Sequence, residues 1–477
     1  MLHHLGYLFG VIVTCRYIIP EKLANNPDSP NLKRVFDVAV AQTVLEHPLL
    51  RVGLVREGSK SPSWVELQQL DLSKHIQWHD GEAGRDSDVI CREVIPNHLD
   101  RRFDSVENKP GWRIMVLHNC DDHELEVIFA WNHANIDGIS GKVFHESLFR
   151  NLNAWEQCSD FPSLKGRILS LPALNGSDIF PPPQEQTAKY TITPRYFVSS
   201  AWKELGPSVL SAATATWANW APMKTSPYGT SVRCLSVGSN DGLRKILVAC
   251  REHGTTLTGL VHAIIFASLA SHLYSEAGPG FAGATALDMR RFSSTGTEAT
   301  MGNYVSDVKH CFGENETAEL RKALQTHSPT DCSNVALWAL LWRIAKRVRG
   351  EIQAKLSRGT RDDVIGLMRF VRDWRQTITR QTRKPRSISW NLSNIGIMNV
   401  DNEVPLTSGQ DAMWTCNRAM FVLGGEVTGA AFNVGIISVQ GKGLEIAVSW
   451  QTCAVDEGIG EQLLTSMNSW MKGLVEA

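Results

Sequence analysis

The chain has 477 residues, with 48 basic and 49 acidic side chains that leave a net charge of −1. Such a balance disfavours nucleic acid and anionic membrane surfaces as partners, because both attract basic proteins. A hydrophobic share of 43% argues against a disordered chain. The length allows roughly two to four domains, or one large body built from two similar halves.

The N-terminal segment LGYLFGVIV, residues 5–13, is apolar enough to suggest a signal peptide. Because it lacks a basic region before it and a small-residue cleavage site after it, a first β-strand is the favoured interpretation. No apolar run reaches the roughly 18 residues that a membrane-spanning helix needs. The ten cysteines are scattered singly, without a CxxC pair. This usage is typical of reduced thiols in a cytoplasmic protein.

The first part of the chain combines helix and strand patterns. Apolar side chains in residues 31–48 keep a helical spacing. Strands are expected at residues 49–57, 63–70, 112–119 and 124–132. This order predicts a mixed sheet with packing helices.

The clearest break in composition lies around three consecutive prolines, Pro181, Pro182 and Pro183. The residues around them contain few apolar side chains and have no period of 2 or 3.6, which indicates a linker. The sequence therefore predicts two subdomains, at residues 1–180 and 195–477, with residues 181–194 as the linker between them.

The second part begins with two consecutive helix patterns, at residues 241–254 and 255–274. Apolar side chains surround the second of these helices, which predicts a buried position. Residues 333–380 are strongly helical and basic on their polar face. Near the end, residues 430–453 resemble a β-hairpin turning at GKG, and Asp456 is expected to cap a last amphipathic helix.

A histidine directly follows an apolar strand in the stretch EVIFAWNHANIDGIS, residues 126–140. The helix pattern that follows leaves room only for a tight loop around His133 and Gly138. An imidazole can take a proton from a hydroxyl that attacks a carbonyl, which accelerates a reaction by about 100- to 10,000-fold. Gly138 permits either a close backbone approach or a positive φ angle.

Structural explanations of the same residues stay open at this stage. Asp137 precedes a helix, where aspartate is a common N-cap, and His133 could be a buried histidine satisfied by the backbone. A metal site formed with His123 and His145 matches no established zinc spacing. A serine hydrolase is disfavoured because the chain has no G-x-S-x-G sequence.

The segment from His133 to Gly138 resembles the H-x-x-x-D-G signature of the chloramphenicol acetyltransferase-like superfamily, the HxxxD acyltransferases. Three further segments are similar to motifs of that superfamily and occur in the same order: TALDMRRF with Asp288 and Arg290, MGNYVSD at 301–307, and ISWNLSNIG at 388–396. The resemblance covers nearly the whole chain. Within the superfamily, the opening segment VIVTCRYIIP at 11–20 and the segment VLEHPLLRVGLV at 44–55 are most similar to the fungal alcohol acetyltransferase-like branch.

Two departures narrow the resemblance. The D-F-G-W-G motif of the plant BAHD branch is absent, which argues against that branch. Asn132 stands where peptide-synthetase condensation domains carry a first histidine, which puts a carrier-linked peptide condensation in doubt.

The resemblance implies an α/β fold of two chloramphenicol acetyltransferase-like subdomains, with mixed sheets, packing helices and an active-site channel between them. It implies an O-acyltransferase that moves an acyl group, expected to be acetyl, from acyl-CoA to a hydroxyl of a small or secondary metabolite. His133 would be the general base, without a covalent acyl-enzyme. Asp137 would form an architectural ion pair with Arg290.

The resemblance also suggests donors for the tetrahedral oxyanion, namely the backbone N–H of Gly138 and the side chain of Ser393 or Asn394. An Asx-type turn before Gly396 explains Asn394 equally well. We expect acyl-CoA as co-substrate, no bound cofactor, no metal, no nucleic acid, a monomer and a cytoplasmic location. A cyclase or condensation-type catalyst of polyketide or peptide biosynthesis and a non-enzymatic binding module are the alternatives.

Other polar residues receive structural interpretations first. His262 and His272 lie in the apolar helix pattern, where core or rim positions are favoured over catalysis. The basic run of Lys346, Arg347 and Arg349 is a candidate for the CoA phosphates, but a solvated helix face explains it at least as well.

Overall fold

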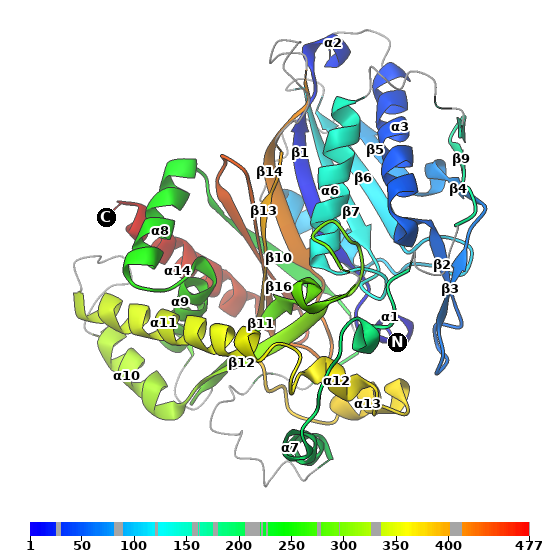
Figure 1. Ribbon diagram of the computed structural model, residues 1–477. Coiled ribbons are helices and arrows are strands. Elements are labelled where there is room, and N and C mark those ends of the chain that lie inside the picture. Colours follow the sequence, from blue (N-terminus) through cyan, green and yellow to red (C-terminus); the bar gives the residue numbers. More distant parts are fainter. Residues whose placement is uncertain are drawn as a thin grey trace.

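Two mixed β-sheets, each covered by helices, make up the body of the protein (Figure 1). This expected mixture of strands and packing helices is confirmed. The computed structural model describes residues 1–24, 30–80, 89–119, 123–154, 161, 163–174, 180–205, 220, 223–225, 228–273, 278–294, 296–325, 335–400 and 413–476.

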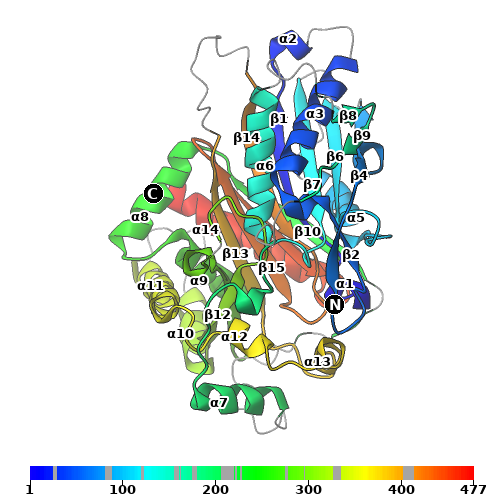
Figure 2. The same cartoon turned by 45° about the vertical axis from the view of Figure 1, so that its right-hand side comes forward.

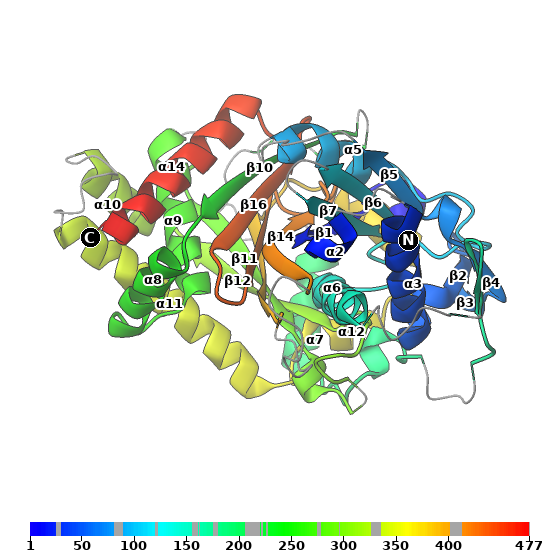
Figure 3. The same ribbon diagram turned by 90° about the horizontal axis from the view of Figure 1, so that it is seen from above.

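The first sheet has five strands, and its alternating side chains form one core on each face. Helices α3 (Pro30–Glu46) and α6 (Gly138–Asn153) cover one face, and α5 (Ile95–Asp100) covers the other (Figure 3). In spatial order the strands are β14 (Thr415–Leu423), β1 (Val11–Ile18), β7 (Glu124–Trp131), β6 (Trp112–Asn119) and β5 (Ile76–Asp80).

The second sheet has six strands with one thick layer of helices on its outer side (Figure 3). Its strands, in spatial order, are β10 (Thr230–Val237), β16 (Leu444–Gln451), β15 (Phe432–Val439), β13 (Trp390–Met398), β11 (Phe281–Asp288) and β12 (Val305–Phe312). The covering helices are α8 (Asn240–Glu252), α9 (Leu257–His272), α11 (Val335–Arg358) and α14 (Glu457–Glu476).

Strand β14 crosses from the second part of the chain into the first sheet, where it pairs with β1. Helix α6 stands beside β14 and β13 at the junction of the two sheets (Figure 2). A bond from Lys142 Nζ to the Ile397 carbonyl, 3.2 Å long, joins α6 to the end of β13. The limits of the two predicted subdomains, 1–180 and 195–477, and the linker at 181–194 stay a prediction. Residues 415–423 belong to the second predicted subdomain, but they form a strand of the first sheet.

Several sequence predictions are confirmed, and two are corrected. The apolar opening contains strand β1, the two helices after residue 240 are present, and the hairpin turns at GKG. The strand expected at 63–70 is wrong, because these residues form two short strands in different sheets. The helical stretch after residue 333 breaks after Arg358, where Gly359 and Asp362 have positive φ angles of 58° and 52°.

The remaining elements are short or peripheral. They are α1 (Leu2–Leu5), α2 (Glu21–Ala24), β2 (Val52–Val55), β3 (Ser63–Glu66), β4 (Gln69–Asp71), β8 (Leu164–Lys165), β9 (Ile168–Ser170), α7 (Pro194–Leu205), α10 (Glu314–Gln325), α12 (Val364–Met368) and α13 (Trp374–Gln381). Within the described ranges, no single helix combines the length and apolarity needed to cross a membrane. Only the bent pair α8 and α9 passes that test together, by length and composition.

Candidate active site

His133 lies in the loop between β7 and α6, half-buried at the junction of the two sheets. The loop is folded back by a hydrogen bond of 2.9 Å from the Trp131 indole N–H to the Ile136 carbonyl. From the second part of the chain, Asn303 Nδ2 donates to the carbonyls of His133 at 2.9 Å and Ala134 at 3.2 Å. The backbone at His133 is therefore held from both parts of the chain.

Asp137 is the N-cap of α6, which was the structural alternative to a functional role for this residue. Its Oδ1 accepts hydrogen bonds from the Ser140 backbone N–H at 3.0 Å and from the Ser140 hydroxyl at 2.8 Å. The bond from the Ser140 N–H satisfies one of the backbone N–H groups that every helix start leaves without an intrahelical partner.

The same carboxylate forms the expected ion pair with Arg290. Two parallel bonds of 2.9 Å join the guanidinium to Asp137, and the side chains of these residues are only 2% and 1% exposed. Burial alone lowers the pKa of Arg290, but the charges of Asp137 and Asp288 outweigh it and raise that pKa above its ordinary value. The N-cap and the ion pair are thus present together.

The segment from Thr300 to Tyr304 clamps this pair, and it contains the G-N motif noted in the sequence. Asp137 donates its N–H to the Gly302 carbonyl at 3.1 Å and accepts the Tyr304 N–H at 3.1 Å. Arg290 Nε donates to the Thr300 carbonyl at 3.0 Å. Three separate sequence motifs therefore meet at one buried network.

Gly138 is required because a neighbour approaches closely, and not because of its backbone angle. A Cβ atom at this position would lie 2.6 Å from Phe421 Cζ and 3.1 Å from Ile395 Cγ2. Gly138 is not among the glycines with positive φ. Of the two explanations open from the sequence, close approach is the one that applies.

Ser393 and Asn394 lie on β13, but the structure gives them different surroundings. The Asn394 carbonyl oxygen accepts the Gly396 N–H at 2.9 Å, and Gly396 has a φ of +82°. Asn394 Nδ2 donates to Thr258 Oγ1 at 3.3 Å. The amide therefore forms the turn that was the alternative explanation, whereas Ser393 shares a strand face with Ile395, the neighbour of Gly138.

Glu426 is a polar neighbour of His133 that the sequence did not reveal. Val11 of β1 pairs with Trp131 on one side and with Leu423 on the other. These are the last residues of β7 and β14, so both strands finish beside the start of β1. His133 and Glu426 follow these two ends. Burial raises the pKa of Glu426, while hydrogen bonding from Thr428 and the charge of His133 oppose that rise.

Two further histidines, His262 and His145, have structural partners, and His272 lies at the surface. His262 is fully buried, as expected, and accepts the Trp390 indole N–H at 2.8 Å. His272 is exposed at the end of α9. His145 bonds the Tyr17 hydroxyl at 2.8 Å and the Val13 carbonyl at 3.0 Å. Because His145 and Asp137 have these other partners, the metal alternative receives no support.

In the basic run on α11, Arg347 is engaged in two ion pairs. Arg347 bonds Glu351 at 2.7 Å and Glu316 at 3.1 Å. For Arg347, this agrees with a salt-bridged helix face more closely than with a phosphate site.

Comparisons with known proteins agree with this geometry. Residues 85–465 match the sequence profile of the family described as alcohol acetyltransferase. A curated relative, "Probable alcohol acetyltransferase FCK4" from Fusarium pseudograminearum, is 25% identical over 484 residues, covering 99% of this chain and 92% of the relative.

Solved structures show the same fold. TRI3 trichothecene 15-O-acetyltransferase from Fusarium sporotrichioides matches with a TM-score of 0.68 and 15% identity, over 98% of this chain and 91% of that chain. The first condensation domain of the CDA synthetase matches with a TM-score of 0.54 and 12% identity, over 99% and 91%. The chain belongs to the alcohol acetyltransferase family, and it is an acyltransferase with the two-subdomain fold of the chloramphenicol acetyltransferase-like superfamily.

Proposed function

We propose that the chain transfers an acyl group, in the first place acetyl, from acyl-CoA to a hydroxyl of a small or secondary metabolite, with His133 as general base. The observation that carries this proposal is how His133 is held. Within the described residues, the hydrogen bonds to His133 go to its carbonyl, so its imidazole stays available at the junction of the two sheets.

In the proposed reaction, the acceptor oxygen attacks the thioester carbonyl while the imidazole removes the hydroxyl proton. The tetrahedral oxyanion collapses, the carbon–sulfur bond breaks, and the CoA thiolate takes the proton back from His133. Gly138 N–H and Ser393 are the proposed oxyanion donors. No acyl group becomes attached to the protein.

Asp137 and Arg290 have an architectural role in this proposal. Their buried ion pair and the Asn303 bond fix the loop, so the imidazole keeps one position while the proton moves. The proposal further takes the enzyme to be a cytoplasmic monomer. The cysteines of the described ranges are free thiols, which agrees with a reducing compartment.

The test is incubation of the purified chain with isotope-labelled acetyl-CoA and a panel of hydroxylated metabolites, followed by mass spectrometry of products and protein. An ester carrying the label, no labelled protein and loss of product in His133→Ala would support the proposal. His272→Ala, which changes an exposed histidine, is the matched control and should keep full activity. Full activity in His133→Ala would disprove the role of His133.

The same experiment separates the alternatives. A cyclase would produce a compound of unchanged mass without using the acyl donor. A binding module would retain ligands without turnover for any acyl-CoA.

A further inference from the structure

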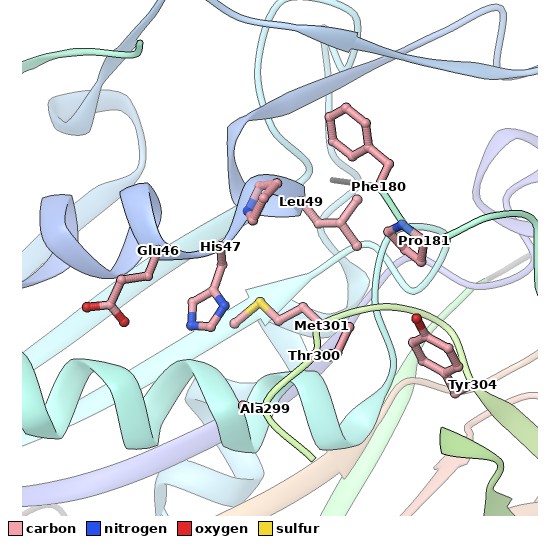
Figure 4. Close-up of a pocket in the computed structure, with 10 residues that line it drawn as sticks. Glu46, His47, Leu49, Phe180, Pro181, Ala299, Thr300, Met301 and Tyr304 are labelled. Carbon is pink, nitrogen blue, oxygen red and sulfur yellow. The ribbon is translucent and has the colours of Figure 1, made fainter. Parts of the chain in front are cut away.

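A cavity of about 240 Å³ lies against the segment that clamps Asp137 (Figure 4). Its walls come from both parts of the chain: Glu46–Leu49 at the end of α3, Phe180 and Pro181, Ala299–Met301, and Tyr304. One side of the segment from Thr300 to Tyr304 therefore faces the cavity, while its backbone holds the His133 loop. None of the functional residues predicted from the sequence lines this space.

Tyr304 contributes a buried hydroxyl without a partner. The residue is only 1% exposed, and its Oη makes no hydrogen bond to the described residues. Figure 4 shows this hydroxyl turned toward the space between Met301 and Pro181. The Arg290 guanidinium lies 4.7 Å from the ring centre, and the backbone N–H is bound to Asp137. The ring is thus fixed while its polar end is unsatisfied.

A buried hydroxyl without a partner is destabilising, because the loss of its bonds to water is not compensated. A ligand oxygen placed in the cavity would remove that destabilisation. The rest of the lining is mixed, because the polar residues His47 and Thr300 stand beside the apolar side chains of Leu49 and Met301.

The cavity carries little net charge. Burial and the charge of Arg150 lower the pKa of His47 to about 4, so its imidazole is neutral at physiological pH. His47 Nε2 bonds the Ser147 hydroxyl at 2.8 Å. Glu46, at the exposed rim, is ion-paired with Arg150. These surroundings do not suit a phosphate, which separates the cavity from the binding of CoA phosphates.

We infer that this cavity binds part of the acceptor, namely a neutral fragment with both polar and apolar surface whose oxygen bonds to the Tyr304 hydroxyl. The inference rests on the proposed function and names the acceptor class for it. The cavity volume of about 240 Å³ is smaller than the roughly 300 to 1,000 Å³ of sites that enclose a whole drug-sized ligand. Tyr304 is then a residue that determines acceptor specificity.

The test uses two neutral probes of matching shape, benzyl alcohol and toluene, and the full chain without acyl-CoA. Binding is measured by saturation-transfer NMR titration. Tyr304→Phe should weaken the binding of benzyl alcohol about five- to tenfold, because one hydrogen bond is lost. The binding of toluene should not change. Because the hydroxyl has no protein partner, the Tm of this variant should stay equal or rise.

Two further variants keep the test falsifiable. Tyr190→Phe removes another buried hydroxyl without a partner, outside the cavity, and should not change the binding of either probe. Met301→Trp should fill the cavity and weaken both probes. Unchanged benzyl alcohol binding in Tyr304→Phe, or unchanged binding of both probes in Met301→Trp, would overturn the inference.

The binding result is independent of turnover. If both probes bind as expected but no acyl-CoA gives an ester, the proposed function fails and the cavity still stands as a site for neutral ligands. If esters form but the probes ignore the cavity, the inference alone fails.

Discussion

Replacing Asp137 with alanine removes the carboxylate at the centre of the buried network. Asp137 accepts five hydrogen bonds, two from Ser140, two from Arg290 and one from the Tyr304 N–H. Its loss leaves the Arg290 guanidinium buried, with Asp288 as its remaining carboxylate partner.

The expected cost is large for a folded protein. Removing one partner of a buried ion pair destabilises by about 3 to 5 kcal/mol, whereas whole domains are stable by about 5 to 15 kcal/mol. Asp137→Ala should therefore lower the free energy of unfolding by about 3 to 5 kcal/mol. The double variant Asp137→Ala with Arg290→Met removes both charges and should be at least as stable as the single variant.

Urea unfolding followed by circular dichroism measures these values. Asp288→Ala is the control, because the Asp288 side chain is 29% exposed and should contribute only about 1 kcal/mol. A loss below about 1 kcal/mol in Asp137→Ala, or a double variant whose cost equals the sum of the two single variants, would refute the architectural role.

Further predictions concern packing, pH dependence and the oxyanion. Gly138→Ala should cost about 1 to 3 kcal/mol by overpacking against Phe421; an unchanged Tm in calorimetry would contradict this. Burial raises the pKa of Glu445 from 4.5 to about 7, so its protonated form is favoured in the folded state and stability falls as pH rises through this window. Glu445→Gln should flatten that slope and gain up to about 3 kcal/mol at pH 8, which urea unfolding at two pH values checks. Ser393→Ala should lower kcat by about 100-fold in steady-state kinetics, the typical effect of losing one oxyanion donor. Asn394→Ala should mainly lower the Tm in calorimetry. If instead Asn394→Ala lowers kcat and Ser393→Ala lowers only the Tm, Asn394 is the oxyanion donor and Ser393 is structural.

The local part of the site could be predicted from the sequence. The apolar strand, the tight loop and the helix after it are set by side-chain period, and Asp137 stands at a helix start where its short carboxylate can cap. Arg290 lies far along the chain, and only the resemblance to HxxxD acyltransferases linked it to Asp137. The ion pair in the structure agrees with that expectation.

Contacts between distant segments could not be predicted in this way. A strand pattern specifies which side chains share a face, but not which strand it pairs with, so residues 415–423 gave no sign of joining the first sheet. That pairing is what places Glu426 near His133 and Phe421 against Gly138. The position of the Tyr304 hydroxyl likewise depends on walls contributed by three separate segments.

The most direct test of the proposed chemistry is a single-turnover reaction of wild-type protein and His133→Ala with labelled acetyl-CoA and a responsive hydroxylated acceptor. The wild-type protein should form the labelled ester, and the protein itself should stay unlabelled. His133→Ala should lose at least about 100-fold in rate while its Tm stays that of wild type. An acetylated protein intermediate, or an undiminished rate in His133→Ala, would contradict the proposed chemistry.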